Sequence, residues 1–101
     1  MKRVRYLVGI MGRVVSDAEQ AGTDFLVYTS NFCNYCTAVK RLLGSKKLTF
    51  TEINFSESGS ETRTEVVDET GHRTVPIVID IRGEQPMFIG GFDETNRYLR
   101  K

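Results

Sequence analysis

The sequence contains no tryptophan, a single histidine and only two cysteines, Cys33 and Cys36, which are separated by two residues. Structural zinc normally takes four ligands, so two cysteines and one histidine are too few for a zinc site within one chain. Secreted domains of this size more often carry several spaced cysteines. A loop closed between neighbours this near stabilises a fold very little. The pair therefore points to chemistry in a reducing cytoplasm, with two inert core cysteines as the alternative.

The chain also lacks a charge excess and a long apolar run. Its formal net charge is +1, with acidic and basic residues mixed along 101 positions. This balance offers no electrostatic case for nucleic acid or a membrane surface as a partner. No stretch approaches the length needed to cross a bilayer. The composition is that of a soluble globular protein of one domain.

The N-terminus resembles an export signal only superficially. Basic residues precede a short apolar stretch at residues 6–11, but Arg13 soon interrupts it and no convincing cleavage site follows. We expect instead an N-terminal extension, residues 1–22, before the domain at residues 23–101. Ile10, Val14 and Val15 would pack an amphipathic helix of this extension onto the domain.

Hydrophobic patterning along the rest of the chain predicts alternating strands and helices. Short apolar or β-branched runs at residues 25–28, 48–53, 77–81 and 87–89 predict strands. Helical patterns begin near Cys33, ending at Gly44, and cover residues 61–70 and 93–100. Residues 56–60 are expected to form a loop.

This order predicts an α/β fold with the topology βαβαββα and an additional N-terminal helix. The first two strands, joined through a helix, should be parallel with a right-handed crossover. The final hairpin should add antiparallel strands. A small mixed sheet flanked by helices in this order is a thioredoxin-like architecture.

The CxxC pair lies where a strand passes into a helix, and this position assigns different roles to its cysteines. Free N–H groups and the helix dipole stabilise a thiolate at a helix N-terminus, so the pKa of Cys33 should fall. Cys36, one turn further along, should remain a thiol. Cys33 is therefore the expected nucleophile and Cys36 the residue that resolves the mixed disulfide.

Three motifs occur in a defined order: YTSNFCNYC at residues 28–36, TVP at residues 74–76 and GGFD at residues 90–93. Together they resemble the glutaredoxin family over about residues 25–100. Thioredoxin itself is disfavoured, because its CxxC normally follows tryptophan, whereas Phe32 stands here, and because GGFD has no role in it.

The resemblance implies a groove that binds glutathione beside Cys33. The residues implied to form it are Tyr35, Arg73, Thr74, Val75, Pro76, Gly90, Gly91, Phe92 and Asp93. A cis bond before Pro76 would let the backbone of Val75 pair with glutathione, whereas a trans proline at a strand start is the alternative.

Charged and polar groups of the implied groove are assigned to the ends of glutathione. The start of the last helix suits the γ-glutamyl carboxylate, and Asp93 its ammonium, although Asp93 would equally serve as a simple N-cap. Arg73 would meet the glycyl carboxylate. His72 is expected to be a solvated loop residue rather than a ligand.

The resemblance implies an enzyme that uses glutathione to reduce protein disulfides and glutathione–protein mixed disulfides, working as a monomer. Two departures qualify the match: Asn34 replaces a common proline, and Ser30 replaces a common lysine. Family members without the proline more often hold a [2Fe-2S] cluster. The alternative is therefore a cluster-binding dimer, ligated by Cys33 and glutathione.

Overall fold

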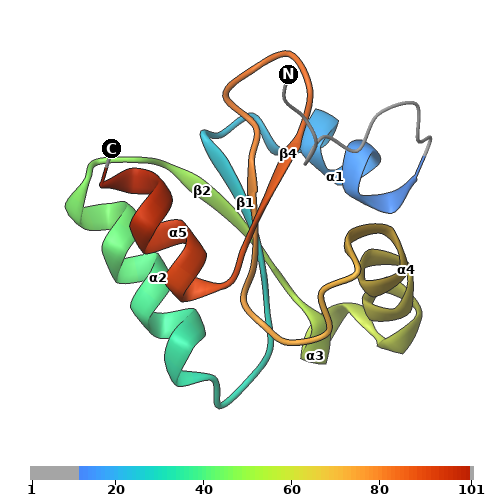
Figure 1. The fold of residues 1–101 in the computed structure, drawn as a ribbon. Helices are drawn as coiled ribbons and strands as arrows, with labels where there is room; N and C mark the ends of the chain where they lie inside the picture. The colour runs from blue at the N-terminus through green and yellow to red at the C-terminus, as the bar shows by residue number, and fades with distance from the viewer. Residues whose placement is uncertain (1–11, 101) are drawn as a thin grey trace.

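A four-stranded mixed sheet forms the centre of the computed structural model, which describes residues 12–100 (Figure 1). Its strand order is β2-β1-β3-β4. The strands are β1 (Phe25–Thr29), β2 (Phe50–Asn54), β3 (Ile77–Asp80) and β4 (Met87–Gly90). β1 pairs in parallel with β2 and antiparallel with β3, and β3 pairs antiparallel with β4. The predicted mixed sheet and both strand orientations are confirmed.

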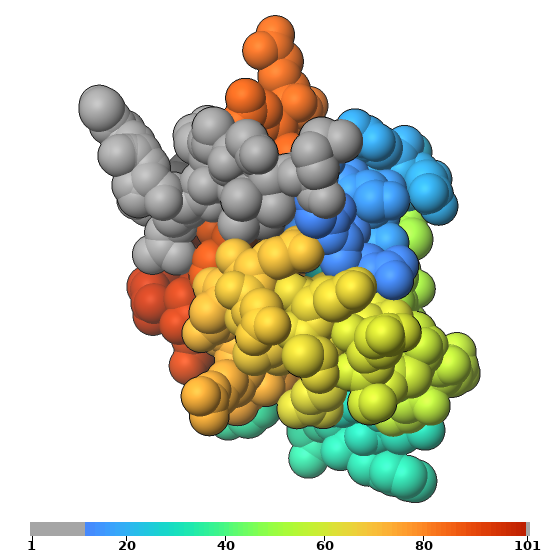
Figure 2. Space-filling view, turned by 90° about the vertical axis from the view of Figure 1, so that its right-hand side faces the viewer, coloured from blue at the N-terminus to red at the C-terminus, as the bar shows by residue number. Residues whose placement is uncertain are grey.

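Helices cover both faces of the sheet. They are α1 (Arg13–Ala21), α2 (Asn34–Ser45), α3 (Phe55–Ser58), α4 (Ser60–Thr70) and α5 (Phe92–Leu99). Figure 1 shows α2 and α5 on one face and α1, α3 and α4 on the other. The latter face is turned toward the viewer in Figure 2, where the β3–β4 loop projects at the top.

The strand β1 supplies side chains to two separate core layers. Leu26 and Tyr28 pack with residues of α1, α3 and α4, whereas Phe25 and Val27 pack with residues of α2. Alternate residues of a strand point to opposite faces of its sheet. All five residues of β1 are buried, because helices cover this central strand on both sides. The loop that leads to α2 thus follows a strand that is buried along its whole length.

The N-terminal helix α1 belongs to the same core. Val14 is fully buried in the layer that contains Tyr28 and Val66, as predicted, and Val15 is partly buried. Ile10 lies outside the described residues. The predicted boundary at residue 22 stays a prediction. No helix among residues 12–100 is long and apolar enough to cross a membrane.

Two local expectations were wrong. Part of the predicted loop at 56–60 is the short helix α3, because the Asn54 side chain accepts a hydrogen bond from the Ser56 N–H and starts a helical turn. The helix α2 does not stop at Gly44. It continues to Ser45, and Lys47 adopts the left-handed conformation that turns the chain toward β2.

Candidate functional site

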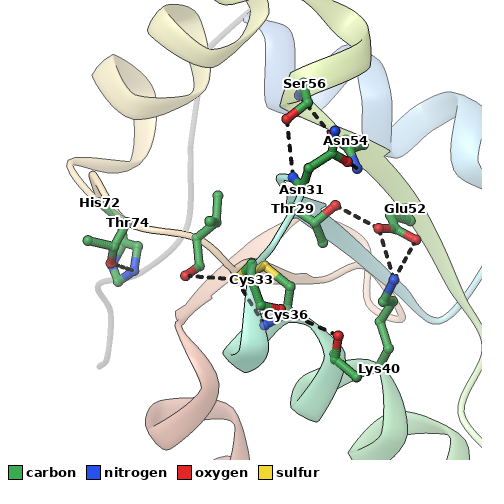
Figure 3. The surroundings of a disulfide bond; sticks show 12 residues. Thr29, Asn31, Cys33, Cys36, Lys40, Glu52, Asn54, Ser56, His72 and Thr74 are labelled. Atoms are coloured by element: carbon green, nitrogen blue, oxygen red, sulfur yellow. Dashed lines mark hydrogen bonds and ion pairs between the residues drawn. A yellow bond between two sulfur atoms is a disulfide. The ribbon is translucent and has the colours of Figure 1, made fainter.

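Cys33 and Cys36 form a disulfide at the beginning of α2 (Figure 3). Cys33 is the N-cap residue, and its Sγ accepts a hydrogen bond from the Cys36 N–H at 3.1 Å. Cys33 is partly exposed, whereas Cys36 is only 3% exposed. The predicted position of the pair at a strand-to-helix junction, with Cys33 the more accessible, is confirmed.

The loop that leads to Cys33 is held to the neighbouring strand and helix. The Asn31 N–H donates to Ser56 Oγ at 3.1 Å, and the Asn54 amide donates to Asn31 Oδ1 at 3.1 Å. Figure 3 shows these three side chains grouped at one side of the disulfide. They connect β2 and α3 to the loop, so the approach to Cys33 has a defined conformation.

A second backbone segment lies beside the disulfide. The Val75–Pro76 peptide bond is cis, as the resemblance implied. The Val75 carbonyl oxygen is 3.8 Å from Cys33 Sγ. Residues that precede β3 therefore form one wall next to the reactive sulfur.

A groove of about 270 Å³ opens between this wall, the start of α2 and the start of α5. Its lining residues are Tyr35, His72, Thr74, Val75, Pro76, Gly91, Phe92, Asp93 and Glu94. The ring centroids of Tyr35 and Phe92 are 6.2 Å apart. Seven of the nine residues that the sequence assigned to glutathione thus lie around one groove.

The N-terminus of α5 faces this groove with Gly91 as its N-cap. The Gly91 N–H donates to Glu94 Oε1 at 2.8 Å, and the carboxylate of Glu94 also takes a hydrogen bond from its own backbone N–H. These two bonds lower the pKa of Glu94. The first N–H groups of a helix have no intrahelical acceptor. The Glu94 carboxylate takes two of those at this end of α5, and the N–H groups of Phe92 and Asp93 are the donors that suit an anion.

Two of the assigned residues lie apart from the groove lining. Gly90 is buried at the end of β4 with a φ of 133°, and a Cβ there would come within 2.9 Å of the Glu94 side chain. Arg73 lines a neighbouring cavity of about 310 Å³ together with Arg63, whose guanidinium donates to the Arg73 carbonyl. Gly90 therefore contacts a residue that lines the groove, Glu94, without lining the groove itself. Arg73 lies outside the groove, in the lining of the neighbouring cavity.

Sequence reasoning missed two lining residues, His72 and Glu94. His72 was expected on a solvated loop, but it is partly buried, its ring packs edge-on against Phe88, and its Nε2 is 3.3 Å from Thr74 Oγ1. Its position two residues before Thr74 was the available signal. For Glu94, the signal was its place directly after GGFD.

A partly exposed ionic cluster joins α2, the end of β1 and β2. Lys40 Nζ contacts both carboxylate oxygens of Glu52 at 3.1 Å, and Thr29 Oγ1 donates to Glu52 Oε2 at 2.6 Å. Burial raises the pKa of Glu52, but the hydrogen bonds from Thr29 and Lys40 outweigh it, so the net pKa is lowered. Thr29 is the last residue of β1, which ties this cluster to the strand that precedes the CxxC segment.

Within residues 12–100, no group of three or more histidine, cysteine or acidic side chains is arranged to hold a metal ion.

Comparison with known proteins agrees with this geometry. The glutaredoxin family model matches residues 25–85. A glutaredoxin of Ricinus communis is 40% identical over 72 residues, which cover 69% of this chain and 67% of that protein. The rice protein glutaredoxin-C4, chloroplastic, is 36% identical over 77 residues, covering 74% of this chain but only 55% of the rice protein.

Solved structures give the same result for the fold. The crystal structure of a wheat glutaredoxin superposes with a TM-score of 0.70 and 27% identity. The superposition covers 85% of this chain and 83% of the wheat protein. The thioredoxin-like arrangement predicted from the sequence is confirmed.

Proposed function

Since this chain belongs to the glutaredoxin family, we propose that it is a glutathione-dependent oxidoreductase for protein disulfides and glutathione–protein mixed disulfides. The family and the CxxC pair support thiol–disulfide chemistry. The observation that carries the proposal is the disulfide at the start of α2, in which Cys33 is partly exposed and its Sγ lies 3.8 Å from the carbonyl oxygen of Val75, a residue that lines the groove.

The two cysteines take different parts in the proposed reaction. The Cys33 thiolate attacks one sulfur of a substrate disulfide, forming a new S–S bond while the other substrate sulfur leaves as a thiolate. The Cys36 thiolate then attacks Cys33 Sγ, which releases the second substrate thiolate and forms the Cys33–Cys36 disulfide. Two electrons pass from the protein to the substrate. Two glutathione molecules restore the dithiol and become glutathione disulfide.

The groove beside Cys33 suits glutathione by the chemistry of its walls. The start of α5 offers backbone N–H groups for the γ-glutamyl carboxylate, and the exposed Asp93 offers a carboxylate for its ammonium. Val75 and Thr74 supply backbone and hydroxyl groups beside the sulfur. Tyr35 provides an aromatic wall. Arg73, which lines the neighbouring cavity, would contact the glycyl carboxylate.

The decisive experiment measures reduction of a small glutathione mixed disulfide, with glutathione, NADPH and glutathione reductase as the recycling system. We expect Cys33→Ser to abolish turnover, because serine supplies no thiolate nucleophile. Cys36→Ser should retain it, because glutathione itself can resolve a mixed disulfide between Cys33 and glutathione. Equal losses in the two variants would contradict the assigned roles, and no turnover by the folded, reduced wild-type protein would contradict the function.

The alternative proposal is a [2Fe-2S] cluster held between two copies of the chain. Cys33 would be this chain's ligand, glutathione would supply the others, and the bound cluster would provide electron transfer or cluster delivery. Asn34, in place of the proline common in dithiol members, is the feature that favours it. Visible absorbance together with a dimeric mass after anaerobic purification would support this function, and a colourless monomer would contradict it.

The setting that suits the proposed reaction is a reducing compartment such as the cytoplasm. Glutathione keeps thiols reduced there, so the Cys33–Cys36 disulfide would be a transient state of turnover. We propose a monomer for the dithiol reaction, since one copy of the chain carries both cysteines and the whole groove.

A further inference from the structure

The two exposed large hydrophobic side chains among residues 12–100 both flank Cys33. Phe32 is 105% exposed and Tyr35 is 63% exposed. The two side chains lie on different surfaces. Tyr35 lines the groove and its ring lies near that of Phe92, whereas Phe32 is not among the residues that line the groove. Exposed apolar groups next to a reactive centre point to a partner that covers them.

The backbone conformation of Phe32 is also costly. Its φ is 58°, in the left-handed region, where a bulky side chain is rare and strained. Such strain persists when surrounding structure imposes it. Here the preceding residue, Asn31, is held by Ser56 and Asn54, and the following residue, Cys33, caps α2. The contacts of its two neighbours therefore hold Phe32 in this conformation, with its side chain fully exposed to solvent.

We propose that Phe32 determines specificity for polypeptide substrates. In this role it packs against an apolar side chain within two residues of the reacting cysteine of a substrate protein. The inference rests on the proposed thiol–disulfide function and adds a second contact surface, separate from the glutathione groove.

The geometry of the reaction brings a substrate chain to this surface. A disulfide between Cys33 and a substrate cysteine holds their Cα atoms about 4.4–6.8 Å apart. Neighbouring residues of the substrate lie 3.8 Å further along its chain per step. A residue adjacent to the substrate cysteine is therefore within reach of the ring of Phe32, which directly precedes Cys33. Small disulfides have no such residue and would gain nothing from this contact.

The test uses two synthetic peptide disulfides as probes. Each is the disulfide-linked dimer of a glycine-rich hexapeptide with one cysteine, preceded by leucine in one probe and by serine in the other. Both are reduced by the full-length protein with glutathione, NADPH and glutathione reductase, after subtraction of the uncatalysed rate. We expect wild-type kcat/KM to favour the leucine probe about fivefold, since burial of a leucine side chain is partial on an open surface.

Variants at residue 32 separate the side chain from the backbone strain. Phe32→Ala should lower the preference to near unity, and Phe32→Leu should restore most of it. Phe32→Gly should abolish the preference while raising the unfolding midpoint, because glycine accepts the left-handed backbone. A matched control is Lys47, the other non-glycine residue with positive φ in the described part of the chain, at 61°. Lys47→Gly should relieve strain in the same way and leave the peptide preference at its wild-type value.

The outcomes distinguish this inference from the function on which it rests. If the wild-type protein reduces neither peptide nor a small glutathione mixed disulfide, the proposed function fails. If it reduces both peptides equally well, or if Phe32→Ala keeps the fivefold preference, the role of Phe32 is overturned while the function stands. A preference lost in Phe32→Ala and regained in Phe32→Leu supports the docking contact.

Discussion

The two ends of the sheet differ in whether their polar side chains are buried and hydrogen-bonded within the protein or exposed to solvent. At the end remote from Cys33, a cavity of about 720 Å³ is lined by Asp80, Arg82 and Tyr98 among others. The Asp80 carboxylate is buried and accepts hydrogen bonds from the Arg82 N–H, the Arg82 guanidinium and the Tyr98 hydroxyl. At the other end, the groove beside Cys33 measures only about 270 Å³, and Asp93 and Thr74 there are exposed.

Cavity size therefore does not identify the reactive end of this molecule. The larger hollow contains a carboxylate whose bonds are already made, and Arg82 also lies over the Phe25 ring at 4.9 Å. Polar groups satisfied in this way stabilise a fold. The smaller groove combines a helix N-terminus with an accessible sulfur, which is the arrangement that binds and reacts. The hydrogen bonds of Asp80 thus contribute to the stability of the fold, whereas the groove beside Cys33 has polar groups available to a ligand.

The first prediction tests this division with Asp80→Asn. The amide cannot accept the same set of charge-assisted bonds, so we expect a loss of about 2–3 kcal/mol in the free energy of unfolding. Reduction of a small glutathione mixed disulfide should stay within about twofold of wild type at 25 °C, because a stability of several kcal/mol still leaves the protein folded. Urea denaturation and the coupled assay measure the two quantities.

Arg82→Gln provides the control for this prediction. This variant leaves the buried Asp80 carboxylate with only the Arg82 N–H and the Tyr98 hydroxyl as donors, so it should also lower the free energy of unfolding and leave the activity close to wild type. A tenfold loss of activity in Asp80→Asn, with the protein fully folded, would contradict the division between the two ends.

The second prediction concerns Gly90, which lies behind the groove. Its φ of 133° is unfavourable for any other residue, and a Cβ would press against Glu94 at 2.9 Å. Gly90→Ala should cost about 1–2 kcal/mol in unfolding free energy. In contrast to Asp80→Asn, it should also raise KM for the glutathione mixed disulfide, because displacing Glu94 disturbs the start of α5.

Gly71→Ala is the matched comparison for Gly90→Ala. Gly71 has a φ of 75°, but open space surrounds the position where its Cβ would lie. We expect it to destabilise the fold through the backbone alone and to leave KM unchanged. If both alanine variants raised KM equally, the contact between Gly90 and Glu94 would not be the cause.

The third prediction uses pH at the remote end. Burial and the hydrogen bond to Asp80 raise the pKa of Tyr98 to about 12 from its ordinary value near 10. A raised pKa in the folded state means that this contribution to stability is complete below pH 10 and is lost as pH rises toward 12. Tyr98→Phe should cost about 1 kcal/mol at pH 7 and flatten the decline between pH 10 and 12. Thermal unfolding of both proteins between pH 10 and 12 measures this decline in stability. If the decline were as steep in Tyr98→Phe as in the wild type, the raised pKa of Tyr98 would not be its cause.

Local patterns in the sequence were sufficient for most of the fold and for the position of the CxxC pair at the start of a helix. The apolar run that became β1 and the following CxxC segment predicted a strand-to-helix junction, because each signal is contained within a few residues. Helix α3 was missed because it depends on a single side-chain cap from Asn54. Its four residues are too few for a hydrophobic pattern of helical period to appear in the sequence.

The groove shows a different limit. Its motifs predicted seven lining residues. The closeness of His72 to Thr74 in sequence indicated that it lies near the groove, but its packing against Phe88 of β4 is a tertiary contact that no local pattern reveals. Arg73 shows the opposite case. It directly precedes Thr74 in the sequence, yet it lines the adjacent cavity and not the groove. Membership of a motif indicates proximity to the site, and only tertiary packing decides which side chains face it.

The last and smallest effect is expected from Lys40→Gln, at the reactive end. Lys40 and Glu52 are each about one-third exposed, so solvent screens their ion pair and its loss should cost less than about 1 kcal/mol. Glu52 would keep its bond from Thr29 Oγ1, which limits the damage. The comparison predicts that ionic contacts near Cys33 contribute little stability, whereas those around buried Asp80 contribute much. Urea denaturation of both variants in one buffer tests this, and a loss in Lys40→Gln equal to that in Asp80→Asn would mean that the two ends do not differ in how they use charge.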